Sequence, residues 1–135
     1  MGTVIRSEVS KKNPYYISRH RYYELKHFCL QYYEWKHEYD KLAFYSSPSL
    51  SEVKSSVQSD RTGDIATKRA EYARKMDLVH SVAMNSDPAI GEIIFKAVTE
   101  GKSYESLNAK ERIICGKNYF YDKHRKFFWL MDSIV

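Results

Sequence analysis

The chain has 135 residues, 43% of them hydrophobic, which is the length of one domain and enough apolar surface for a core. No apolar run approaches the roughly 20 residues that a bilayer-spanning helix needs, and the basic N-terminus leads into no signal-like segment, so we expect neither a membrane protein nor a signal-directed secreted one. The two cysteines favour reduced cytoplasmic thiols over a disulfide framework, and five glycines and three prolines argue against a loop-rich all-β fold.

The formal net charge of +5 is concentrated at two places. Residues 1–27 carry six Lys/Arg against two Asp/Glu, residues 110–126 again carry six against two, and residues 28–109 between them carry ten against twelve. Two basic segments around a mildly acidic middle favour a polyanionic partner, for which nucleic acid is the usual candidate. The alternative is an ordinary solvated charged surface.

Residues 1–17 form a basic, aromatic N-terminal arm, and the interleaving of bases with tyrosines continues to residue 23. Cations beside aromatic rings suit single-stranded nucleic acid, which gives a secondary candidate patch. Its residues are Lys11, Lys12, Arg19 and Arg21. The paired tyrosines at 15/16, 22/23 and 32/33 can also be interpreted as packing residues. A helix can bury only one ring of each pair fully, which leaves the other ring available to a protein partner.

A first helix is predicted over 18–45, capped by Ser18, because its large apolar residues recur in steps of 3 and 4. The Ser-rich residues 46–63 are predicted to be a flexible linker. A second helix starts near Asp64 and has a similar apolar seam, so the two helices should pair as a long antiparallel hairpin. The same seams could pair between two chains, which leaves a homodimer as an alternative.

The C-terminal part predicts a three-helix unit. The segment from Asn85 to Pro88 is predicted to end the second helix and to begin a third, which ends at Gly101. Ser103 caps a short helix to about residue 109, a turn follows, and a last helix runs from about 117 to 131. Its predicted buried stripe is Phe120, His124, Phe127 and Met131. The expected fold is therefore all-α, with residues 64–135 holding the second helix and a helix-turn-helix-like motif, in a single domain overall.

In a helix-turn-helix the second helix enters the major groove of DNA while the first braces it. The outward face of the last helix has suitable chemistry, since asparagine can read adenine and lysine can meet guanine or a phosphate. The predicted contacts to double-stranded DNA are Lys117, Asn118, Tyr119, Lys123, Arg125 and Lys126. The alternative is a terminal helix with a basic solvated face.

Catalytic and metal-binding chemistry find little support. The five histidines show no ligand spacing with either cysteine, there is no His-Glu-x-x-His, and no glycine-rich phosphate loop occurs. We expect no enzyme, no metal and no cofactor.

The blocks NPYYISRHRYYELKHFCLQYYEWKHEYDKL, KAVTEGKSYESL and CGKNYFYDKHRKFFWLM resemble a small all-helical family encoded in phages and prophages of low-GC Gram-positive bacteria. The last block is also similar to the C-terminal helix-turn-helix of RinA- and ArpU-type late-gene activators and to region 4 of sigma factors. Ser103, Tyr104 and Leu107 match the first helix of that motif. The start of the second helix is matched by Asn118, Tyr119, Phe120 and Tyr121, and its body by Arg125 and Phe127.

The resemblance implies a phage or prophage transcriptional regulator in the cytoplasm of the bacterial host, acting on promoter DNA beside RNA polymerase. Two departures leave a protein-binding use of the motif open. The turn from Lys110 to Lys117 lacks the compact glycine turn of sigma-type motifs, and Asp122 places an acid on the DNA-facing side. The alternative function is an anti-CRISPR-like inhibitor of a host defence enzyme or ribonucleoprotein.

Overall fold

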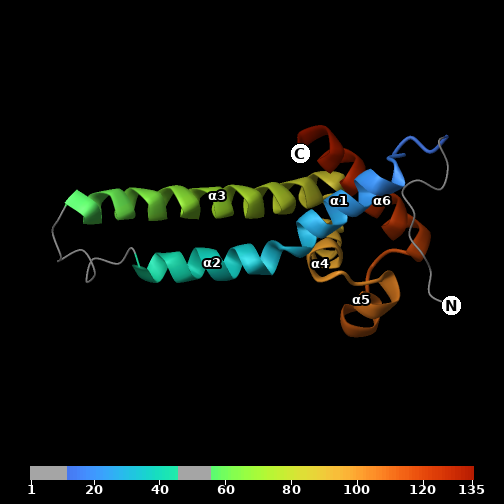
Figure 1. Ribbon diagram of the computed structural model, residues 1–135. Helices are drawn as coiled ribbons and strands as arrows, with labels where there is room; N and C mark the ends of the chain where they lie inside the picture. The colour runs from blue at the N-terminus through green and yellow to red at the C-terminus, as the bar shows by residue number, and fades with distance from the viewer. Residues whose placement is uncertain (1–11, 46–55) are drawn as a thin grey trace. The chain divides into compact units, whose positions relative to one another are not determined.

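The computed structural model describes residues 12–45 and 56–135, and within these ranges the chain is helical and contains no strand (Figure 1). The all-α fold class is confirmed. The helices are α1 (Arg19–Leu30), α2 (Tyr32–Tyr45), α3 (Ser56–Ser86), α4 (Gly91–Glu100), α5 (Tyr104–Glu111) and α6 (Lys117–Ile134). The chain divides into two compact units: unit 1 comprises Met1–Gln31 and Val79–Val135, and unit 2 comprises Tyr32–Leu78.

Unit 2 is an antiparallel helical hairpin of α2 and the larger part of α3, which run side by side in Figure 1. The guanidinium of Arg69 lies 4.1 Å from the ring centroid of Tyr39, and its Nε donates to the Tyr39 carbonyl at 3.4 Å. Lys75 lies over the ring of Trp35, whose side chain is buried. Cation–π contacts therefore join α2 to α3 within unit 2.

The helix expected over 18–45 is two helices, because it is interrupted at Gln31. The Gln31 amide donates to the Phe28 carbonyl, an i to i−3 bond that tightens the last turn of α1 and ends it. Neither glycine nor proline marks this position, so the sequence contains no conventional signal for the break. The structure also differs from the expected linker 46–63: residues 46–55 lie outside the described ranges, and 56–63 belong to α3.

Unit 1 has its own core, in which α1 packs against α4 and α6, and α5 packs against α4 and α6. The segment predicted as one arm of the hairpin is thus divided, since α1 packs with the C-terminal helices α4 and α6. The buried stripe of α1 is Tyr22, Leu25 and Cys29. The predicted stripe of α6 is confirmed, since Phe120, His124, Phe127 and Met131 are all buried.

The start and end of α4 follow from local chemistry. The Asp87 carboxylate accepts hydrogen bonds from the amides of Ala89 and Ile90, so it caps the turn that leads into the helix. A Cβ added at Gly91 would lie 2.8 Å from the Cα of Met84, so only glycine permits this approach to the end of α3. Gly101 ends α4 with φ +66°, in the left-handed conformation that the sequence predicted.

The helix, turn and helix of residues 103–134 take the predicted order. The Ser103 hydroxyl accepts from the Ser106 amide and caps α5. Arg112 closes α5 with φ +54°, a conformation that glycine usually supplies, and the side chain of Asn108 accepts from the Ile113 amide at 2.8 Å. Ile113 is buried, which anchors the turn between α5 and α6.

Candidate nucleic-acid interface

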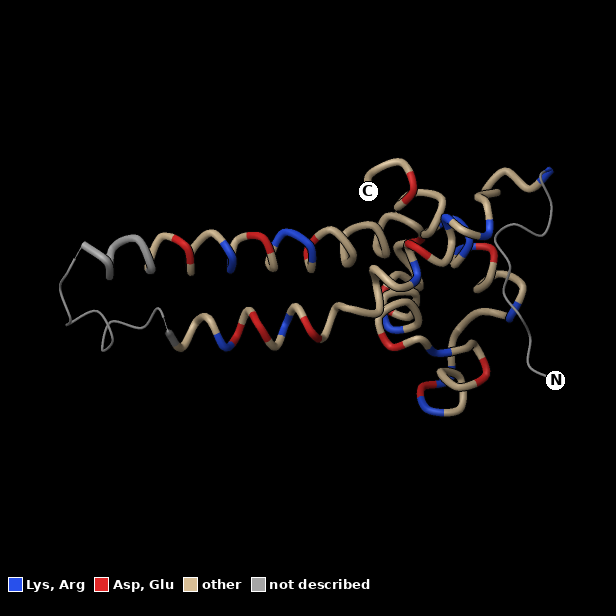
Figure 2. The backbone as a smooth tube through the Cα atoms, in the orientation of Figure 1, with Lys and Arg blue, Asp and Glu red and all other residues tan. Residues whose placement is uncertain are grey.

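The charge excess of the chain lies in unit 1. Its described residues, 12–31 and 79–135, carry twelve Lys/Arg against eight Asp/Glu, whereas residues 32–78 of unit 2 carry eight of each. Figure 2 shows bases and acids interspersed along α2 and α3. Unit 1 is therefore the electropositive part of the protein and the part in which a polyanion would be sought.

The start of α6 is tied to α5. Lys117 forms an ion pair with Glu105, and the hydroxyl of Tyr121 accepts from the Tyr104 amide at 3.0 Å. The hydroxyl of Tyr104 in turn donates to the Cys115 carbonyl at 2.8 Å. These bonds fix the direction in which α6 leaves the turn. They also engage Lys117, one of the six predicted DNA contacts, within the protein.

Tyr119 and Lys123 are brought together one turn apart on α6, with the ammonium of Lys123 5.2 Å from the ring centroid of Tyr119. The Tyr119 hydroxyl donates to the carboxylate of Asp87. Burial opposes ionisation of Asp87, but the bonds from Tyr119, Ala89 and Ile90 and the nearby Lys123 outweigh it and lower the pKa of Asp87. The same bond, together with burial, raises the pKa of Tyr119. The Tyr119 hydroxyl thus holds α6 to the start of α4, and its ring remains 46% exposed.

The remaining predicted contacts differ in exposure. Asn118 is exposed, whereas Lys126 and Arg125 are half-buried, and the Nε of Arg125 is buried without a hydrogen-bond partner. Asp122 is also half-buried and lies 3.7 Å from the ammonium of Lys123, measured from its Oδ2. The acid that the sequence placed on this face therefore offsets part of the charge of the neighbouring lysine.

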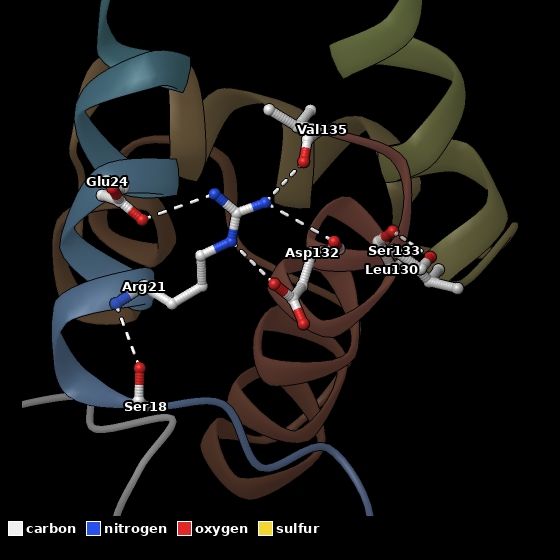
Figure 3. A network of polar contacts seen from close by, with 7 residues as sticks. All are labelled: Ser18, Arg21, Glu24, Leu130, Asp132, Ser133 and Val135. Atoms are coloured by element: carbon white, nitrogen blue, oxygen red, sulfur yellow. Dashed lines mark hydrogen bonds and ion pairs between the residues drawn. The ribbon is translucent and has the colours of Figure 1, made fainter.

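The secondary patch does not act as one group of accessible cations. Lys11 lies outside the described residues, and Lys12 and Arg19 are exposed. Arg21 is held at the end of α6 (Figure 3), where its Nε donates to Asp132 at 2.7 Å and its Nη2 to the Val135 carbonyl at 2.6 Å.

The guanidinium of Arg21 also pairs with Glu24 at 3.4 Å. The bond to Asp132 outweighs desolvation and raises the pKa of Arg21. These contacts join α1 to α6, a structural role that charge counting along the sequence cannot separate from a ligand-binding role. The paired tyrosines behave as packing predicts at 22/23, where Tyr22 is buried and Tyr23 is 43% exposed.

A cleft of about 250 Å³, which the sequence did not predict, lies in unit 1 between α1, the α4–α5 junction and α6. Its lining comes from segments far apart in the chain, which only the tertiary structure brings together. The polar lining includes Lys26, Lys102, Ser103 and His124. Burial, with the nearby charges of Arg125 and Lys26, lowers the pKa of His124 to about 3. Its imidazole is therefore neutral in the folded protein.

Comparisons with known protein families, with characterised proteins and with solved structures find no significant match. No helix in the described ranges combines the length and apolarity that a membrane-spanning segment needs. Those ranges also contain no group of three or more His, Cys, Asp or Glu side chains placed to hold a metal ion.

Proposed function

We propose that the protein is a DNA-binding transcriptional regulator of a phage or prophage, in which α6 enters the major groove of double-stranded DNA and α5 braces it. The observation that carries this proposal is the helix-turn-helix succession within the electropositive unit. α5 is eight residues long, α6 is eighteen, and five residues separate them. A short bracing helix before a longer basic one is the order that major-groove readers use.

The internal bonds of α6 support the proposal by leaving a defined contact surface. Lys117 and Tyr119 are tethered to Glu105 and Asp87, so they orient the helix instead of reaching for bases. Asn118 is exposed beside the start of α6, where recognition helices make their base contacts, and can read adenine. Lys123 and Lys126 follow along the helix and would neutralise phosphates.

The test is duplex binding measured against salt concentration by fluorescence anisotropy. Neutralised phosphates release counterions, so affinity should fall steeply as salt rises. Lys123→Glu combined with Lys126→Glu should lower the affinity and reduce the slope of log affinity against log salt by about two, one for each lost phosphate contact. The matched control is Lys36→Glu with Lys68→Glu in unit 2, which makes the same charge change and should alter neither.

Asp122 gives an opposite-sign test of the same surface. Asp122→Asn removes an acid beside Lys123 and should raise duplex affinity, because the carboxylate repels phosphate and competes for the lysine. Unchanged binding in both the lysine pair and Asp122→Asn would refute the assignment of α6 as the DNA-contacting helix.

A second candidate is an interaction protein that inhibits a host defence enzyme or ribonucleoprotein. The observation that favours it is the set of large apolar side chains exposed on unit 1, above all Ile114 in the turn, which is 83% exposed, and Trp129 on α6, which is 41% exposed. Aromatic residues are enriched in protein interfaces. If this second candidate is right, Ile114→Asp should abolish capture of the host target. If the regulator proposal is right, the same variant should leave the affinity for duplex DNA within twofold of the wild type.

A further inference from the structure

The cleft in unit 1 has a lining of unusual composition for a surface depression. Its apolar wall is formed by Leu30 of α1, Ala97 and Val98 of α4, and Phe128 of α6. Two lysines, Lys26 and Lys102, and two tyrosine rings complete it, and no aspartate or glutamate belongs to the lining. The lining therefore combines hydrocarbon groups with two cationic side chains.

His124 is the buried polar residue in the lining of the cleft. Its side chain is only 6% exposed, yet it lines the cleft, and its Nδ1 is one of two buried side-chain nitrogens or oxygens in the described ranges that lack a hydrogen-bond partner. Leaving a buried polar atom unpaired is unfavourable, because the atom loses its hydrogen bonds to water. The rings of Phe120, Tyr121 and Phe128 surround the imidazole at centroid distances of 5.9, 6.0 and 5.1 Å, so it has little freedom to turn elsewhere.

The charges around the cleft select the sign of the ligand. In the described part of the chain, Lys26 and Lys102 form no ion pair that would cancel their charge; Lys26 lies 5.8 Å from the ring centroid of Tyr23.

We propose that this cleft binds a small organic anion, with its apolar body against Leu30, Val98 and Phe128 and its carboxylate or phosphate head near the ammonium groups of Lys26 and Lys102. The volume of about 250 Å³ is slightly below the range of roughly 300–1,000 Å³ typical of small-molecule sites, which suits a ligand with a single ring or a branched alkyl group. The site is separate from the outward face of α6 and does not depend on DNA binding.

The experiment is a titration of the full chain, labelled with ¹⁵N, with four probes: benzoate, phenyl phosphate, benzamide and inorganic phosphate. We expect benzoate or phenyl phosphate to shift the ring nitrogens of His124 in a saturable way. Benzamide lacks the charge and inorganic phosphate lacks the apolar body, so each should bind at least about tenfold more weakly than the better anion. The two anions with rings distinguish a carboxylate from a phosphate ligand.

Variants locate the site. Lys26→Met and Lys102→Met keep the apolar stem and remove the charge, so each should weaken the better anion about tenfold and leave the fold intact, as circular dichroism would report. Lys110→Met, on the exposed side of α5, is the matched control and should change nothing. The proposal is overturned if neither anion shifts His124 at millimolar concentration, if benzamide binds as well as benzoate, or if the lysine variants bind like the control.

Discussion

The neutral, buried imidazole of His124 makes the stability of the protein depend on pH. In the unfolded chain a histidine has its ordinary pKa near 6.5, whereas burial, with the charges of Arg125 and Lys26, lowers the folded value to about 3. Because folding lowers the pKa of this imidazole, the unfolded chain binds the proton more readily than the folded protein does. The stability is therefore complete above pH 6.5 and is lost progressively as the pH falls from 6.5 toward 3.

The size of the effect follows from the same two values. One pKa unit corresponds to 1.36 kcal/mol, so this imidazole alone should lower the free energy of unfolding by roughly 1 kcal/mol between pH 7.5 and 5.5, and by roughly 3 kcal/mol by pH 4.5. Small domains have a total of about 5–15 kcal/mol, so the loss is measurable by urea unfolding.

The variant His124→Gln removes the titration, so its free energy of unfolding should change about 2–3 kcal/mol less over the same pH range, whatever its stability at pH 7.5. His27→Gln, which replaces an exposed imidazole on α1, is the control and should keep the full loss. A loss of equal size in His124→Gln and the wild type would refute the reasoning. A direct check is the ¹⁵N signal of the His124 ring, which should remain that of a neutral imidazole at pH 4.5 in the folded protein.

Two further predictions test the packing of unit 1. Gly91→Ala should lower the free energy of unfolding by about 1–3 kcal/mol, because the new Cβ meets the Cα of Met84 at 2.8 Å. Gly63→Ala, in α3 with open space around it, should raise the free energy of unfolding by up to about 1 kcal/mol. Urea unfolding that gives the same sign for both variants would contradict the contact assigned to Gly91. Burial raises the pKa of Cys29 to about 12 and, with Asp87, also raises that of the half-buried Cys115, so at pH 8 Ellman's reagent should modify Cys115 first and Cys29 only on unfolding. Equal modification rates in the native protein would show that Cys29 is not enclosed.

Several elements could be predicted because their causes are local. The left-handed end of α4 at Gly101, the Ser103 cap and the buried stripe of α6 each depend on residues within one or two turns of each other. The buried and exposed members of the tyrosine pair 22/23 follow from helical geometry alone, because adjacent residues on a helix cannot share one face.

The candidate site could be predicted only in part. The sequence identified the basic face of α6, but the partners that engage it, Glu105 for Lys117 and Asp87 for Tyr119, lie 12 and 32 residues earlier in the chain. Arg21, expected among nucleic-acid contacts, binds Asp132 at the other end of the chain. An ion pair over such a separation leaves no periodic trace in the sequence.

The sequence by itself determined the helical class, the order of the C-terminal helices and the positive charge, because these depend on composition and on spacings within a helix. The tertiary structure decided which helices share a core. The 3–4 spacing of apolar residues runs through Gln31, yet α1 ends there and packs with α4 and α6 in unit 1, while α2 pairs with α3 in unit 2. It also decided where a ligand could bind, because the cleft exists only where Lys26, Lys102 and His124 are brought together from three distant segments.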